Sequence, residues 1–213
     1  IVAEQYERVD FMSTYGVVPF SIWESDDPKF SNPILKHLKE RQGESTRENT
    51  LKSFGGAGEN TAYTATTSYF NPKLCKIIYS SYCPKNGTIF DPFSSVVRPY
   101  MAKILDYNYV GCEVRKDECD KINEMLNTNS LFEESDVRVL NMDCREFETD
   151  QKFDLVFTCP PYWNLETYSE QDNDLSSITD YSDFLTEMSK VYSKCSSLMH
   201  EESYCCFVVA DFR

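Results

Sequence analysis

Two consecutive prolines, Pro160 and Pro161, stand between Cys159 and Tyr162 and follow the apolar run 153–157. A short run of this kind is typical of a buried strand in a parallel sheet. Because proline has no backbone N–H, the ladder of hydrogen bonds must stop there. The turn is therefore expected at the carboxyl edge of the sheet, where open α/β folds bind ligands. Its free carbonyls and the flat face of Tyr162 predict a site for a planar base that carries an exocyclic amine.

Acidic residues end three further predicted strands: Asp91, Glu113 and Asp143. The carboxyl ends of parallel strands meet at one edge, so these carboxylates are expected side by side near the proline turn. An acid after the second strand can accept hydrogen bonds from both hydroxyls of a ribose. An acid after the third can accept from an adenine amine, and one after the first can reach the cationic amino-acid end of S-adenosylmethionine. Acids are common in loops after strands, but three in register beside a Pro-Pro-Tyr turn favour a nucleoside-containing cofactor.

Strands and helices are predicted to alternate from about residue 71 onward. This alternation favours right-handed crossovers and an α/β fold with a mostly parallel sheet and helices on both faces. Dinucleotide enzymes and methyltransferases share this Rossmann-like skeleton, so the fold alone does not select a function. The predicted strands are 88–91, 109–113, 137–140, 153–157 and 204–210, and the predicted helices cover 97–107 and 117–127 and begin near 72 and 180.

The spacing of apolar residues predicts which side of each helix faces the core. The expected inward residues are Leu74, Ile77 and Ile78 in the first helix, Ile122, Met125 and Leu126 in the third, and Phe184, Leu185, Met188, Val191 and Tyr192 in the fourth.

Residues 1–62 differ from the rest of the chain. They are aromatic and polar, with one helix start at Ser31-Asn32-Pro33 and a polar, glycine-containing stretch at 42–62 that predicts a mobile loop. We therefore expect an N-terminal extension, 1–62, followed by one domain at 63–213 that is large enough for a real core.

The net charge, the lack of long apolar runs and the cysteine pattern limit the possible functions. The net charge of −14 argues against a broad phosphate-binding surface, although a local basic face at 29–52 could suffice. No apolar run approaches the roughly 20 residues of a membrane span, and the acidic start does not look like a signal peptide. The nine cysteines form no Cys-x-x-Cys pair. This argues against a zinc site and favours reduced thiols in the cytoplasm.

The proline turn resembles the catalytic motif of the DNA amino-methyltransferases, Asp/Asn/Ser-Pro-Pro-Tyr/Phe/Trp, which methylate N4 of cytosine or N6 of adenine. The Thr-x-Pro-Pro form, with Thr158 and Cys159, is closer to the cytosine-N4 branch, and the run 159–169 is most similar to enzymes of phages and prophages. The resemblance implies a class I methyltransferase of double-stranded DNA, of the kind found in restriction-modification, in the cytoplasm of a bacterium or a phage-infected host.

The resemblance extends over about 63–213 and assigns the other site residues. The base would leave the helix stack and lie against Tyr162, shielded by Trp163, while the carbonyls at Cys159 and Pro160 hold the amine. Glu166 and Tyr168 would line the target pocket. The residues that would bind S-adenosylmethionine are Asn71, Pro72, Asp91, Phe93, Ser94, Ser95, Glu113, Asp143 and Cys144.

Three departures from the family pattern leave alternatives open. No glycine occurs between Gly87 and Gly111, so the cofactor loop after Asp91 lacks the residues that allow positive φ. Cys159 is a poorer hydrogen-bonding group than Ser, Asn or Asp. The predicted sheet stops at its fifth strand, whereas the family has seven, which implies missing strands and an open edge that a partner subunit or a dimer would cover.

The loop without glycine, the missing strands and the net negative charge favour a second hypothesis, a cofactor-free module that binds a partner. A third keeps the enzyme but changes the substrate to RNA or a protein amide. Covalent catalysis by Cys159, as in cytosine-C5 enzymes, is disfavoured because the cysteine precedes the prolines instead of following one.

Overall fold

The structure is a computed structural model that describes residues 70–128, 135–163, 167–169 and 171–209. The predicted extension at 1–62, with its helix and loop, lies outside the described residues, as does Glu166. Within the described residues, no helix is both long enough and apolar enough to cross a membrane.

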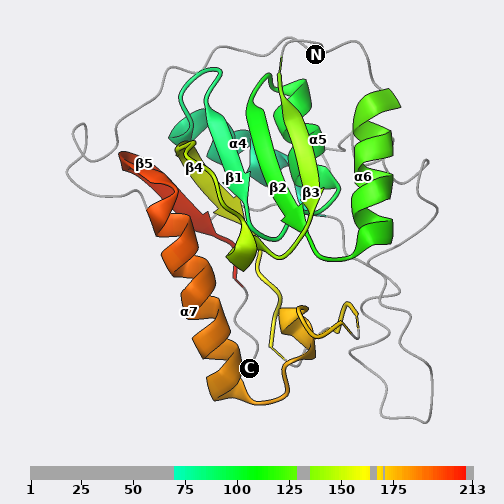
Figure 1. Ribbon diagram of the computed structural model, residues 1–213. Helices are drawn as coiled ribbons and strands as arrows, with labels where there is room; N and C mark the ends of the chain where they lie inside the picture. Colours follow the sequence, from blue (N-terminus) through cyan, green and yellow to red (C-terminus); the bar gives the residue numbers. More distant parts are fainter. Residues whose placement is uncertain (1–69, 129–134, 164–166, 170, 210–213) are drawn as a thin grey trace.

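Five parallel strands form one sheet in the described part of the chain, in the order β3-β2-β1-β4-β5 (Figure 1). This is the strand order of a doubly wound Rossmann-like sheet, so the predicted fold class is confirmed. Successive strands are added toward one side of β1 up to β3 and toward the other side from β4 onward, so the strand order reverses between β1 and β4. The carboxyl ends of these two strands border the crevice where such folds bind ligands. The strands are β1 (Thr88–Asp91), β2 (Asn108–Glu113), β3 (Val137–Asn141), β4 (Phe153–Thr158) and β5 (Met199–Phe207).

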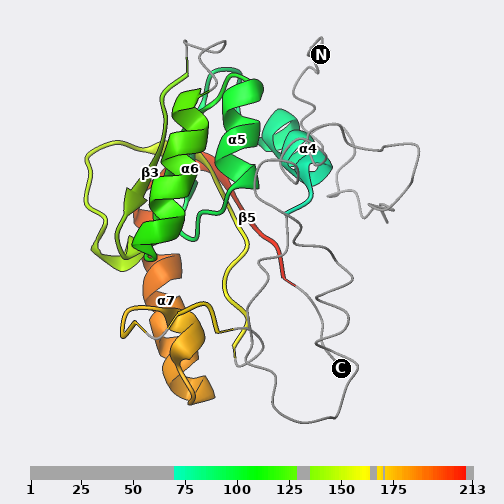
Figure 2. The same cartoon turned by 90° about the vertical axis from the view of Figure 1, so that its right-hand side faces the viewer.

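Helices cover both faces of the sheet, as predicted (Figures 1 and 2). Helices α4, α5 and α6 bury one apolar cluster against the sheet, and α7 buries the other together with two short 3-10 turns. The helices are α4 (Pro72–Tyr82), α5 (Val97–Ile104), α6 (Lys116–Thr128) and α7 (Tyr181–Ser197), and the turns are η2 (Cys144–Glu146) and η3 (Leu175–Ser177).

The inward face of α4 differs from the prediction. Cys75 and Tyr79 are fully buried, whereas Leu74 and Ile78 only pack against the margin of the cluster. Tyr79 is drawn inward because its ring packs on β4 and its hydroxyl donates a 3.0 Å hydrogen bond to the Arg98 carbonyl. A tyrosine and a cysteine therefore took core positions that the prediction gave to aliphatic residues.

The predicted face of α7 is partly wrong. Phe184, Met188 and Val191 are buried as expected, but Leu185 and Tyr192 are 49% and 44% exposed. Each of these two follows a buried residue by one position, which turns it about 100° around the helix. Cys195 completes the buried stripe instead.

Two element ends also differ. Helix α5 ends at Ile104, three residues before the predicted end, and Asp106 turns the chain with a φ of 60°. Strand β5 begins at Met199, five residues earlier than predicted, because the polar stretch after it pairs with β4 across a register shift. The Ser203 hydroxyl donates a 2.7 Å bond to the Phe153 carbonyl and thereby ties this stretch to the sheet.

Candidate active site at the carboxyl edge of the sheet

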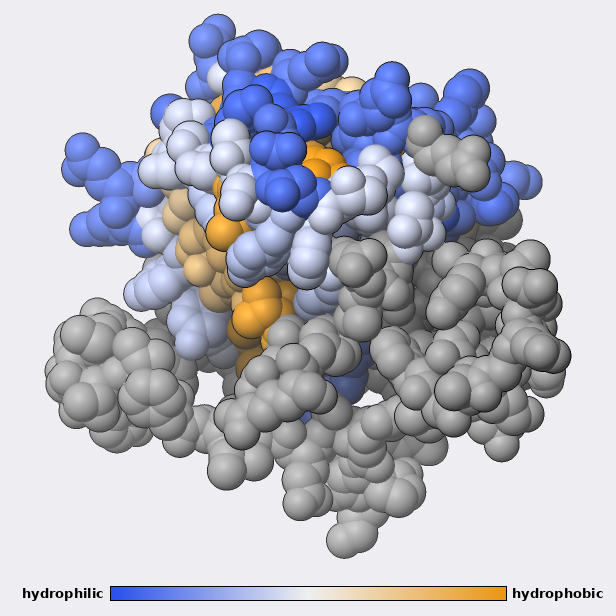
Figure 3. Space-filling view, turned by 90° about the horizontal axis from the view of Figure 1, so that it is seen from below, coloured by the Kyte–Doolittle hydropathy of each residue, from blue (hydrophilic) through white to orange (hydrophobic). Residues whose placement is uncertain are grey.

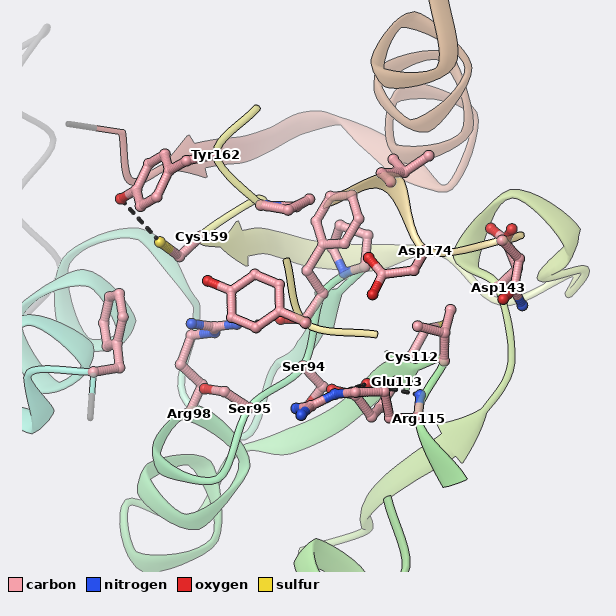
Figure 4. A pocket seen from close by; sticks show the side chains of 18 residues that line it. Ser94, Ser95, Arg98, Cys112, Glu113, Arg115, Asp143, Cys159, Tyr162 and Asp174 are labelled. Carbon is pink, nitrogen blue, oxygen red and sulfur yellow. Dashed lines mark hydrogen bonds and ion pairs between the residues drawn. The ribbon is translucent and has the colours of Figure 1, made fainter. Parts of the chain in front are cut away.

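A pocket opens at the carboxyl edge of the sheet, where the ends of β2 and β4 and the loop after β1 meet. Seen from this edge, apolar side chains form a band flanked by hydrophilic ones (Figure 3). Nine residues predicted for the site line the pocket (Figure 4): Phe93, Ser94, Ser95, Glu113, Asp143, Cys159, Pro161, Tyr162 and Tyr168. The structure does not bring six others to its wall: Asn71, Pro72, Asp91, Cys144, Pro160 and Trp163.

Asp91 is the centre of a buried network behind the pocket. Its carboxylate is fully buried and accepts hydrogen bonds from Arg98 Nε at 2.6 Å and from the Tyr109 and Thr158 hydroxyls at 2.5 Å each. Burial acts to lower the pKa of the Arg98 guanidinium, but the ion pair with Asp91 more than offsets this and the pKa is raised. The carboxylate predicted to face a cationic ligand is thus already paired, and Arg98 takes its place on the pocket wall.

The loop after β1 contains no glycine, and its close contact with β2 is made possible by Gly111 on that strand. The Ser94 amide donates a 2.8 Å hydrogen bond to the Cys112 carbonyl of β2. A Cβ atom on Gly111 would lie 2.6 Å from Ser94 Oγ, closer than real Cβ contacts allow. Positive φ outside glycine occurs in the described residues only at Asn86 and Asp106, so the loop needs no positive φ of its own.

Glu113 ends β2 and presents its carboxylate to the pocket. Its side chain is only 11% exposed, and Oε1 accepts a 2.8 Å hydrogen bond from the Arg115 amide. Burial raises the pKa of Glu113, while Arg115 acts in the opposite direction. The remaining acceptor capacity of this carboxylate can receive hydrogen bonds from ligand hydroxyls.

Asp143 lies beyond the end of β3 and caps η2, where its side chain accepts from the Arg145 amide. The Arg145 guanidinium also grips both carboxylate oxygens of Asp143 and reaches Glu187 on α7. This bond with Asp143 helps to raise the pKa of Arg145. Through Arg145, Asp143 therefore connects the end of β3 to α7, and this structural role is separate from any contact with a ligand.

Only some residues of the proline turn face the pocket. Cys159 Sγ lies 3.5 Å from the Tyr162 hydroxyl, and both side chains line the pocket together with Pro161. Pro160 is buried. Trp163 turns away to pack on Tyr181, with ring centroids 5.0 Å apart.

One part of the pocket wall was not predicted from the sequence. It is formed by Arg115, next to the predicted Tyr168, and by residues 173–175. The Arg115 guanidinium lies 5.8 Å from the centroid of the Tyr168 ring. Asp174 is 5% exposed and accepts from the hydroxyls of Ser169 and Ser176 at 2.7 Å each. The only signal in the sequence was the Asp-x-Ser spacing at 174–176, which is typical of a capped turn.

No family model matches this sequence, and no curated protein matches it. Several solved structures of methyltransferases are similar in fold. An rRNA methylase from Streptococcus thermophilus is 7% identical over 66% of this chain and 71% of its own, with a TM-score of 0.45. An S-adenosylmethionine-dependent methyltransferase from Clostridium acetobutylicum is 11% identical over 82% of this chain and 56% of its own, with a TM-score of 0.44. The N-methyltransferase NodS from Bradyrhizobium japonicum is 13% identical over 63% of each chain, with a TM-score of 0.41. The Rossmann-like assignment of this chain rests on the order and direction of its own strands.

Proposed function

We propose that this chain transfers a methyl group from S-adenosylmethionine to an exocyclic amine of a base in double-stranded DNA. The observation that carries the proposal is that Glu113 and three residues of the proline turn, Cys159, Pro161 and Tyr162, line one pocket. A carboxylate suited to a ribose and a proline turn suited to an amine thus share the carboxyl edge. N4 of cytosine is favoured over N6 of adenine because Thr158 precedes the turn.

The pocket fits the cofactor in chemical type. Glu113 has free acceptor capacity for ribose hydroxyls, and Asp143 lies on the wall beyond it. Ser95 and Arg98 supply donors at the other end (Figure 4). When bound, the cofactor supplies an electrophilic methyl group, so that catalysis depends largely on positioning the amine.

The residues of the proline turn orient the base. The Tyr162 ring stacks on a base that has left the helix, which is necessary because the reacting amine is inaccessible in the duplex. Backbone carbonyls of the turn accept hydrogen bonds from the amine and leave its lone pair directed at the methyl group. With the amine held in this way, its nitrogen would accept the methyl group as the bond from that carbon to the sulfonium sulfur breaks, and solvent would accept the proton that the amine loses.

DNA contact must be local, because a chain with a net charge of −14 repels phosphates over most of its surface. The basic stretch at 29–52 is the candidate for this contact and lies outside the described residues. A restriction-modification setting in the cytoplasm of a bacterium or a phage-infected host follows as part of the same proposal.

Tritiated S-adenosylmethionine and duplex DNA of mixed sequence test this function, with digestion to nucleosides to identify the product. Labelled N4-methylcytosine is expected. Tyr162→Ala should lower the rate about five- to hundredfold, because stacking on an aromatic ring contributes about 1–3 kcal/mol per base. Tyr192→Ala, on the exposed side of α7, is the control. Label in RNA or protein but not in DNA would overturn the choice of substrate.

A non-catalytic module is the second candidate, and the pairing of Asp91 with Arg98 is the observation that favours it. It predicts that the folded protein binds no S-adenosylmethionine in a calorimetric titration. Such a module would act through a partner, for which the outer edge of β5 is available, since no strand of the described residues pairs with it.

A further inference from the structure

Arg98 occupies the end of the pocket opposite Asp143 (Figure 4). The residue is 2% exposed, yet it forms part of the pocket wall. Its Nε donates to Asp91 at 2.6 Å, its Nη2 donates to the Phe93 carbonyl, and its guanidinium lies 5.0 Å from the centroid of the Phe70 ring. Within the described residues Nη1 has no hydrogen-bond partner. A buried guanidinium fixed on three sides is thus left with one donor group for a ligand.

Two further features beside Arg98 favour an anion. Ser95 Oγ is buried, lines the pocket and has no hydrogen-bond partner in the described part of the chain. Helix α5 begins beside it, and Val96 at its N-cap provides no side-chain cap. The first backbone N–H groups of a helix attract negative charge, and no side chain of the described residues caps them here. An arginine and a serine hydroxyl therefore line one place on the pocket wall, next in sequence to an uncapped helix start.

We propose that Arg98, Ser95 and the start of α5 form a carboxylate subsite that binds the carboxylate at the amino-acid end of S-adenosylmethionine. The inference rests on the proposed function and extends it. Asp91, predicted to contact the amino-acid end itself, instead acts as a positioning residue that holds Arg98 in place. The Nη1 group of the guanidinium, left over from the bonds to Asp91 and Phe93, can donate a charge-assisted hydrogen bond to a carboxylate oxygen.

The charges around Arg98 favour a carboxylate over a phosphate. The ion pair with Asp91 has no net charge, so the subsite cannot balance the two charges of a phosphate group. A carboxylate next to an ammonium adds no net charge to the pair. Away from Arg98, the Glu113 carboxylate can accept hydrogen bonds from the ribose hydroxyls. The adenosine and the amino-acid group of the cofactor would therefore bind to different parts of the pocket.

The test first compares two ligands on the wild-type protein and then repeats the comparison on variants. Calorimetric titration compares S-adenosylhomocysteine with its decarboxylated analogue, S-adenosyl-3-thiopropylamine. Loss of a hydrogen bond between charged groups costs about 1.5–3 kcal/mol, so the analogue should bind the wild type about ten- to hundredfold more weakly. In Arg98→Lys, which keeps the charge but cannot contact Asp91, the Phe93 carbonyl and a ligand at once with a fixed planar group, the difference between the two ligands should shrink. Arg138→Gln, a half-exposed arginine of β3 that is not part of the pocket wall, should leave the difference unchanged.

The outcomes distinguish failure of the carboxylate subsite from failure of the proposed function. Equal binding of the two ligands by the wild type would overturn the carboxylate subsite and leave the proposed function standing. Binding of neither ligand by a cooperatively folded protein would overturn both. Because a change at a buried ion pair can unfold the chain, the paired variant Asp91→Asn with Arg98→Gln replaces it by neutral groups. If this variant is folded and still prefers the carboxylated ligand, Arg98 is not the residue that reads the carboxylate.

Discussion

Glu113 is the residue whose charge decides what the pocket can bind. Ligand hydroxyls donate hydrogen bonds to an ionised carboxylate, and a protonated one loses much of this capacity. Burial raises the pKa of Glu113 above the ordinary value of 4.5, and the bonds from Arg115 only partly counter this. Two quantities, the affinity for the cofactor and the stability of the free protein, therefore depend on pH in opposite directions.

Cofactor affinity should fall as the pH drops through the raised pKa of Glu113, because the protonated side chain no longer accepts from both ribose hydroxyls. The stability of the free protein should change the other way. A carboxyl group whose pKa is raised by folding destabilises the fold above that pKa, and this cost is relieved as the pH falls toward 4.5. Titration calorimetry and urea unfolding across this window measure both effects.

Glu113→Gln is the matched variant for this prediction. It should bind the cofactor about tenfold more weakly at neutral pH, because a hydrogen bond to a charged group is lost. Its affinity should also vary less with pH between neutrality and 4.5. A variant with the same pH profile as the wild type would assign the titration to another group.

At the scale of elements, the loop after β1 and strand β2 act as one unit. Ser94 contacts β2 through the amide bond to Cys112, and its Oγ lies 3.0 Å from the Tyr109 hydroxyl. Since Tyr109 gives its proton to Asp91, Ser94 acts as the donor in this pair. The close approach depends on the missing side chain at Gly111.

Gly111→Ala should displace the loop, because the new Cβ would lie 2.6 Å from Ser94 Oγ and 2.8 Å from Tyr109 Cε1. Overpacking of this kind costs about 1–3 kcal/mol of unfolding free energy. Cofactor affinity should fall as well, since Ser94 and Ser95 line the pocket. Urea unfolding and calorimetry measure the two losses.

Adding Ser94→Gly to Gly111→Ala provides the control, because it removes one of the two clashes. Partial recovery of stability is expected, with the contact to Tyr109 remaining. If the double variant is no more stable than Gly111→Ala alone, the loop is not what the new methyl group strikes.

The elements differ in how far the sequence could predict them. Strands β1 to β4 were predicted almost to the residue because each is a short apolar run between polar turns. The faces of α4 and α7 were less predictable, since tyrosines such as Tyr79 and Tyr192 can be buried or exposed according to contacts that lie far away in sequence. The pairing of Asp91 with Arg98 could not be read at all. It spans a turn and depends on burial, so the prediction placed a free carboxylate where the structure has an ion pair.

At the scale of the whole molecule, the pocket lies where the two halves of the sheet meet. Strands β1 and β2 deliver the groups that would hold a cofactor, and β4 delivers those that would hold a base. The described residues of the segment after the proline turn, 167–169 and 171–177, form the remaining wall through Asp174 and Tyr168. Neither half has the complete site, so occupancy of one half should be detectable in the other.

The nine cysteines make this coupling measurable, because they sample the whole fold. Six are buried, and burial raises the pKa of the Cys112 thiol, the buried one that lines the pocket. Cys159 is half-buried on the pocket wall, and Cys205 is exposed on β5 and is not part of that wall. Alkylation followed by peptide mass spectrometry therefore reports the pocket and the surface separately.

Saturation with S-adenosylhomocysteine should slow alkylation of Cys159 and leave that of Cys205 unchanged. At a ligand concentration 100-fold above Kd, about 1% of the sites remain free, so the rate at Cys159 should fall by up to about a hundredfold. Adenosine, which lacks the amino-acid group, should protect less, because Cys159 and Arg98 lie at the same end of the pocket (Figure 4). Equal protection at both cysteines would point to a general tightening of the fold, and no protection at Cys159 in a protein that binds the ligand would place the ligand outside this pocket.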